Sequence, residues 1–200
     1  MTQPTTLRDL VGLGHTPSAI SESALIIIDA QNTYREGILQ LEGVEPALEE
    51  ARALLDRFRA AGRPVFHIQH DAGEGSPYDT NAPIGQIADV VAPKDGEPVI
   101  TKQFPSSFAQ TDLAEQLNKT GVSNLILVGF MTHMCVNSTA RAAFTLGYNP
   151  TVVASATASR ALPARGTGQS LPAGQIHEAA LAALSDLPSA VVNQQSDIPD

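Results

Sequence analysis

Three side chains with reactive groups stand at the ends of apolar runs that lie far apart in the sequence. Asp29 ends the first run and Lys102 ends a later one, while Cys135, the single cysteine of the chain, lies just past a further run. A thiol, a carboxylate and an ammonium group could together perform nucleophilic catalysis, in which the carboxylate accepts the thiol proton. The sequence therefore points first to a cysteine hydrolase with Asp29 as the base and Lys102 beside the pair.

Each of these residues also has a structural interpretation that the sequence leaves open. A single cysteine is more often a small buried residue, an aspartate after a strand can cap the following loop, and a lysine at a strand end can be solvated. Two observations favour catalysis. We expect Cys135 in the first turn of a helix, where backbone N–H groups favour a thiolate, and a carboxylate after three isoleucines costs free energy unless it is paired.

The histidines offer alternatives to Asp29 as the catalytic base, but their spacing does not predict a metal site. His133, two residues before Cys135, competes with Asp29 as the base, and His70 at a predicted strand end could assist. His67 and His70 are three residues apart on a strand and so face opposite sides, which does not favour shared metal ligation. The sequence has neither a dinucleotide-binding nor a phosphate-binding glycine motif, so we expect no metal and no other cofactor.

Short apolar runs alternate with segments of helical spacing along the chain. The pattern predicts strands at 24–29, 64–70, 98–102, 124–130, 151–154 and 190–193, and helices within 44–61, 111–118, 134–146 and 175–184. Residues 71–93 and 157–171 are predicted as long loops. Strands that alternate with helices predict an α/β fold whose mostly parallel sheet has helices on both faces, which would place the three reactive residues at one edge.

Composition narrows the possible partners and locations. The chain has 200 residues, of which 42% are hydrophobic and 16% charged, so we expect one domain over residues 21–200 after an N-terminal arm at 1–20. The net charge of −9 disfavours nucleic acid and anionic membranes. The N-terminus lacks the pattern of a signal peptide, and a single cysteine cannot form an internal disulfide, so we expect a cytoplasmic location.

Three segments resemble the isochorismatase-like cysteine hydrolase family: LIIIDAQN at 25–32, ITKQFPSSF at 100–108 and VGFMTHMCVNSTAR at 128–141. The resemblance runs from about residue 24 to 193 and implies a three-layer sandwich around a six-stranded parallel sheet of order 3-2-1-4-5-6. It also implies that Asp29 takes the proton of Cys135 and later passes it to a leaving amine, while Lys102 balances charge.

The resemblance implies further site residues. It places a cis peptide bond between Phe130 and Met131, so that the Met131 N–H would join that of Cys135 in binding an oxyanion. The positions of the matching segments also suggest the walls of a substrate pocket. We expect these walls to include Gln31, Phe104, Phe108, Met131 and His133.

Departures from subgroups of the family narrow the reaction. Nicotinamidases bind a metal through an aspartate and histidines that residues 67–71 do not reproduce, and isochorismatases proper lack the cysteine. The resemblance therefore predicts cleavage of an amide, lactam or carbamoyl C–N bond in a small molecule through a covalent thiol intermediate. Two alternatives remain: vinyl-ether hydrolysis with Asp29 as general acid, and a non-catalytic binding protein on the same scaffold. Because family members commonly associate, we expect a homo-oligomer.

Overall fold

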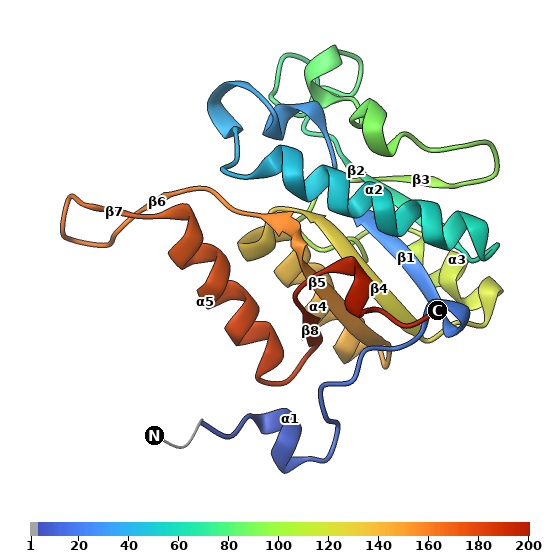
Figure 1. Cartoon of the computed structure of the whole chain (residues 1–200). Helices are drawn as coiled ribbons and strands as arrows, with labels where there is room; N and C mark the ends of the chain where they lie inside the picture. Colours follow the sequence, from blue (N-terminus) through green and yellow to red (C-terminus); the bar gives the residue numbers. More distant parts are fainter. Residues whose placement is uncertain (1–3) are drawn as a thin grey trace.

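The computed structural model describes residues 4–200, and six strands within them form one parallel sheet (Figure 1). The spatial order is β3-β2-β1-β4-β5-β8, which is 3-2-1-4-5-6 when these six strands are numbered along the chain. The predicted α/β fold and strand order are confirmed. The strands are β1 (Ser23–Ile28), β2 (Val65–His70), β3 (Val99–Lys102), β4 (Asn124–Phe130), β5 (Asn149–Ala158) and β8 (Ala190–Val192).

Helices cover both faces of the sheet, as predicted. Helix α2 (Val44–Ala60) lies across one face, and α3 (Leu113–Thr120), α4 (Asn137–Thr145) and α5 (Ala173–Ser185) lie on the other (Figure 1). Short helical turns connect these elements: η1 (Ile20–Glu22), η2 (Asn32–Tyr34), η3 (Gly37–Leu39), η4 (Pro83–Gly85), η5 (Asp89–Val91) and η7 (Gln195–Asp197), with a π-helix, η6 (Thr132–Val136), directly before α4.

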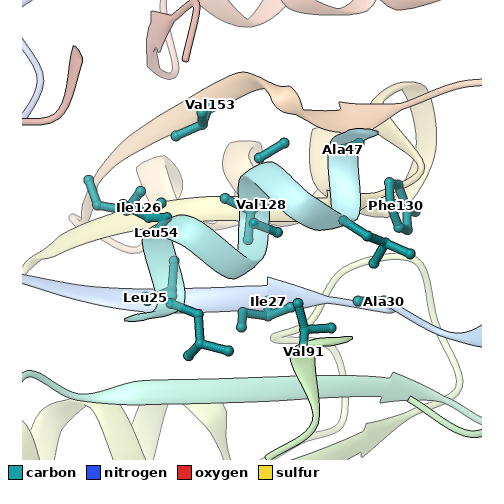
Figure 2. Close-up of a cluster of buried hydrophobic side chains, with 14 of the residues drawn as sticks. Leu25, Ile27, Ala30, Ala47, Leu54, Val91, Ile126, Val128, Phe130 and Val153 are labelled. Atoms are coloured by element: carbon teal, nitrogen blue, oxygen red, sulfur yellow. The ribbon is translucent and has the colours of Figure 1, made fainter. Parts of the chain in front are cut away.

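Alternate residues of the central strands supply the two halves of the core. In β1, Leu25 and Ile27 face α2, while Ile26 faces the opposite layer of helices. Figure 2 shows α2 over the strands, with its Ala47 and Leu54 above the β1 and β4 side chains. Full burial of such a side chain stabilises the fold by about 1.5–3 kcal/mol. The continuous apolar sequence of β1 thus reflects a strand that is buried on both faces.

The segment after residue 150 departs from the prediction. Strand β5 continues to Ala158, beyond the predicted 151–154, and the predicted loop at 157–171 contains a small hairpin of β6 (Leu162–Pro163) and β7 (Ser170–Leu171). Strand β5 leaves β4 after Val152 and rejoins it at Thr157, because the register between the two strands shifts. This irregular, alanine-rich stretch has no regular alternation, which is why the pattern predicts a loop there.

The N-terminal segment lies apart from the sheet in Figure 1. Its helix α1 (Leu7–Leu10) is anchored by the buried Arg8, whose guanidinium donates to the carbonyls of Gly14 and Leu187. The first three residues of the predicted arm at 1–20 lie outside the described part. The domain boundary at residue 20 stays a prediction. Within residues 4–200, no helix is both long and apolar enough to cross a membrane.

Candidate functional site

The reactive side chains lie at the carboxyl edge of the sheet, where the strand order reverses between β1 and β4. Asp29 follows the last residue of β1, and Cys135 lies in η6 just after β4. On the next two strands, His70 and Lys102 are register partners. Ligands bind at this kind of edge in open parallel sheets, so the topology brings the three predicted residues to the expected place.

Two backbone features bring β1 and β4 close together at this edge. Gly129 has a positive φ of 108°, and a side chain there would overlap the carbonyl oxygen of Ile28, so only glycine permits the approach. Asp29 has a φ of 48°, in the left-handed region that aspartate tolerates better than most residues. The chain therefore turns away sharply after β1 and leaves the Asp29 carboxyl group in the interior.

Lys102 connects the site. Its Nζ lies 2.7 Å from Asp29 Oδ2, 3.4 Å from Cys135 Sγ and 3.1 Å from His70 Nδ1. The ammonium group makes hydrogen bonds with the sulfur and the imidazole, and the carboxylate lies within ion-pair distance. Within residues 4–200 no aligned hydrogen bond reaches either Asp29 oxygen, so its contact with Lys102 is an ion pair held at short distance rather than a directed hydrogen bond.

Burial shapes the protonation of the pair. Burial raises the pKa of Asp29, although Lys102 opposes the change. Burial and, next, the negative charge of Asp29 raise the pKa of the Cys135 thiol to about 12. These effects outweigh the helix terminus that favours a thiolate, so at neutral pH the thiol keeps its proton. Asp29 lies close enough to the thiol for its charge to raise the Cys135 pKa, and its own raised pKa makes it the better proton acceptor.

His70 supports Lys102. Burial, and then the Lys102 charge, lower the pKa of His70 to about 4, so the imidazole is neutral near pH 7. Its Nδ1 must then accept the Lys102 proton, which leaves the ring proton on Nε2. The edge of its ring meets that of Tyr78 with centroids 4.6 Å apart, which fixes its orientation. His70 thus gives the ammonium group a second neighbour besides Asp29 and helps to position it.

The other residues expected to line a pocket differ in how deeply they are buried and in what they contact. Gln31 is fully buried, and its amide binds the backbone N–H and C=O of His70 and the C=O of Gly85. Phe108 stacks on Tyr148, which precedes β5 at the far edge of the sheet from Cys135. In contrast, Phe104 is 42% exposed in the segment that follows Lys102.

The segment between β4 and α4 carries the remaining predicted groups. The peptide bond between Phe130 and Met131 is cis, as the resemblance implies. The Met131 carbonyl accepts hydrogen bonds from the N–H groups of Met134 and Val136 and skips that of Cys135 between them. His133 Nδ1 lies 3.1 Å from Ser159 Oγ.

Two tyrosines near the site escaped prediction from the sequence. Tyr34 is fully buried in η2, and its hydroxyl lies 3.0 Å from that of Tyr78 in the 71–93 segment. The ring of Tyr34 also meets Phe130 edge to face at 5.6 Å. The position of Tyr34, five residues after Asp29, was the only sequence signal, and Tyr78 had none because its loop has no regular pattern.

Cavities lie at both edges of the sheet. One of about 230 Å³ beside η6 is lined in part by Ser159 and His177, and His177 Nδ1 lies 2.9 Å from Thr132 Oγ1. A larger one of about 770 Å³ lies at the opposite edge, near Arg59 and Glu97. Within residues 4–200 no group of three or more His, Cys, Asp or Glu side chains is placed to hold a metal ion.

The parallel sheet thus gathers a cysteine, a carboxylate and a lysine at its switch point. Residues 23–195 match the family model described as "Isochorismatase domain". The chain therefore belongs to the isochorismatase family of hydrolases, which confirms the resemblance predicted from its motifs.

Solved structures and relatives agree with this assignment. A crystal structure of an isochorismatase from Pseudomonas putida superimposes with a TM-score of 0.93 at 38% identity, covering 98% of this chain and 100% of the other. A secreted isochorismatase effector from Verticillium dahliae is 35% identical, covering 94% of this chain and 96% of its own. An ureidoacrylate amidohydrolase from Stutzerimonas stutzeri is 32% identical over 68% of this chain and 70% of its own.

Proposed function

We propose that this protein hydrolyses the C–N bond of a small amide, lactam or carbamoyl compound through a covalent intermediate on Cys135. The observation that carries the proposal is that one buried ammonium group, Lys102, contacts both the Asp29 carboxylate and the Cys135 sulfur. The relative named as an amidohydrolase supports C–N cleavage as the reaction. The alternative vinyl-ether chemistry has no need of a thiol in contact with the lysine.

The proposed reaction begins when Asp29 accepts the thiol proton as Cys135 Sγ attacks the carbonyl carbon. Negative charge moves from the carboxylate to sulfur and then to the carbonyl oxygen, while Lys102 stays in contact with both starting groups. The protonated Asp29 then gives its proton to the leaving nitrogen, and the C–N bond breaks to leave a thioester. Water, deprotonated by Asp29, hydrolyses this thioester and releases an acid and the free thiol.

Within this proposal, the N–H groups of Met131 and Cys135 bind the oxygen on which charge develops. Losing one such donor typically costs on the order of 3 kcal/mol of transition-state stabilisation. Of the residues expected to line the pocket, Phe104 and His133 suit contact with substrate. Gln31 fits a positioning role, because its amide binds backbone groups at the site edge, and the stacking of Phe108 on Tyr148 suits a structural one.

The test is a screen of small amides, lactams and carbamoyl compounds for released ammonia or amine, with the wild type and Cys135→Ala compared. We expect turnover to fall by at least about 10³-fold in the variant, and the wild type to show an acyl adduct by mass spectrometry. Turnover that survives in Cys135→Ala would support the vinyl-ether alternative. A folded wild type that turns over no compound and forms no adduct would support a non-catalytic protein.

Location and assembly belong to the same proposal. We propose a cytoplasmic homo-oligomer, because the chain has one cysteine and no disulfide and because its family commonly associates. The name of the Verticillium relative describes a secreted protein, so location needs its own measurement. Cell fractionation and light scattering of the purified protein would test the two statements separately.

A further inference from the structure

The residues just past β5 carry a positive charge that the proposed reaction does not use. Strand β5 rejoins β4 at its end, where Ala158 is the register partner of Phe130. Ser159 and Arg160 therefore leave the sheet at the same edge as the segment that carries Cys135. The contact between Ser159 Oγ and His133 Nδ1, at 3.1 Å, connects the two segments directly.

Arg160 differs from the other arginines of the described chain. Its Nε is buried, yet within residues 4–200 the guanidinium makes no hydrogen bond or ion pair. Arg165 also has no such contact there, but it is exposed on the β6–β7 hairpin, where water satisfies it. Seven arginines donate hydrogen bonds to protein groups: Arg8, Arg35, Arg52, Arg57, Arg59, Arg63 and Arg141. A half-buried guanidinium without an acceptor is costly, so the fold keeps it at a cost in stability.

The charge of Arg160 acts on two side chains near the reactive groups. Burial lowers the pKa of His133, and the Arg160 charge lowers it further. Burial raises the pKa of Tyr78, and Arg160 opposes that change. His133 precedes Cys135, and Tyr78 contacts His70 across the site. Both effects agree with the register and the Ser159 contact, which bring Arg160 to the edge that carries η6.

No carboxylate of the described chain pairs with Arg160. Asp29 and Lys102 compensate each other, and His70 is neutral near pH 7 because its pKa is about 4. Asp71 follows His70 at this edge, but within residues 4–200 no ion pair joins it to Arg160, so the guanidinium stays without a protein anion. Glu42 lies along the neighbouring cavity with Ser159, but no ion pair joins it to Arg160 within the described residues.

We infer that Arg160 binds a carboxylate of the substrate, so that the compound cleaved at Cys135 carries a negative charge near its scissile carbonyl. This inference rests on the proposed function and names its substrate class: anionic amides and ureides rather than neutral ones. A guanidinium suits the task because its planar fork can hold both carboxylate oxygens at once. The same contact would position the carbonyl carbon in front of the sulfur and disfavour neutral amides.

Binding to an inactive protein tests the inference without relying on turnover. In the Cys135→Ala background, succinamate and succinamide differ only in carrying a carboxylate or an amide at the far end. We expect titration calorimetry to show succinamate binding about 10- to 100-fold more tightly, and Arg160→Gln to remove this preference. The matched control, Arg165→Gln, removes the same charge from the exposed hairpin and should keep it.

Three results would overturn the inference: equal binding of the two compounds, a preference that survives Arg160→Gln, or no binding of succinamate. Melting temperatures of all variants establish that Arg160→Gln is folded. The two proposals fail separately. A carboxylate preference in a protein whose wild type hydrolyses nothing would leave the Arg160 site standing without the reaction. Hydrolysis of neutral and anionic amides with equal kcat/KM would leave the reaction standing without the Arg160 site.

Discussion

Strand β2 has a histidine near each end, and the two surroundings differ in what they leave unsatisfied. At the amino-terminal end, His67 Nε2 lies 3.0 Å from Glu97, which also holds Arg59 at 2.7 Å and accepts the Lys94 N–H. At the carboxyl end, His70 accepts from Lys102, whose ion-pair partner Asp29 has no aligned hydrogen bond within the described chain.

The number of hydrogen-bond donors distinguishes the structural pair of Glu97 and Arg59 from the reactive pair of Asp29 and Lys102. Glu97 is held by several donors, so although burial raises its pKa, the hydrogen bonds from Arg59, Lys94 and His67 lower it to about 2. Asp29 has fewer such donors, and burial raises its pKa. A carboxylate that must accept and release a proton cannot be held as firmly as Glu97. The two clusters therefore predict opposite responses to substitution.

The largest expected effect is the loss of turnover on substitution at the carboxyl edge of the sheet. Asp29→Asn removes the proton acceptor while keeping the size of the side chain, so kcat should fall by about 10³-fold or more. Glu97→Gln, the equivalent change at the other end of β2, should leave kcat within about twofold of the wild type. Steady-state kinetics on a substrate identified by the screen would measure both.

A thiol titration separates the base from a merely repulsive charge in this variant. Because the Asp29 charge raises the Cys135 pKa, Asp29→Asn should lower that pKa below about 12, as followed by the ultraviolet absorbance of the thiolate. The variant would then combine a more acidic thiol with lost turnover. If Asp29→Asn instead lowered the thiol pKa and raised turnover, Asp29 would only repel the thiolate and would not act as the base.

The sequence predicts the three reactive residues better than the rest of the site. Asp29, Lys102 and Cys135 each follow a regular apolar run, so the topology rule alone brings them to one edge. Arg160 and Tyr78 lie in segments without periodicity, and their places depend on the register shift in β5 and on the path of the 71–93 loop. Local pattern carries no information on either, because both are set by tertiary packing.

The sequence also does not predict the raised pKa of Cys135. The prediction of a helix terminus near Cys135 is sound, since η6 begins at Thr132, but it says nothing about burial depth. At 6% exposure, the thiol loses solvation that outweighs the helix terminus. Burial depends on which segments cover the edge, and those segments are the irregular ones.

The second largest expected effect is a loss of stability on substitution of Glu97, beside the amino-terminal half of β2. Glu97→Gln should lower the free energy of unfolding by about 2 kcal/mol near neutral pH, because hydrogen bonds to a charged group are lost in a half-buried position. The folded-state pKa of Glu97, about 2, is below its usual value of 4.5, so this stability is complete above about 4.5 and is lost as pH falls toward 2.

Urea denaturation at several pH values would check this prediction. The difference between wild type and Glu97→Gln should stay constant from about pH 7 to pH 5 and shrink below about pH 4.5. Glu115→Gln is the matched control, because its pair with Lys119 is 2.8 Å long but more than two-thirds exposed, so its loss should cost much less stability than that of Glu97. A difference that stays constant with pH would mean that the Glu97 charge is not what stabilises this end.

The smallest effect compares the two histidines directly. His70→Leu removes the acceptor that holds one Lys102 proton, so the ammonium group gains freedom and kcat should fall about tenfold. His67→Leu removes one of several donors to Glu97 and an unpartnered buried Nδ1, so kcat should not change and stability should shift by less than about 1 kcal/mol. Equal losses of kcat in both variants would show that β2 transmits a general packing defect. A loss confined to His70→Leu would instead place the catalytic requirement on the orientation of Lys102, since both substitutions remove a neutral ring from the same strand.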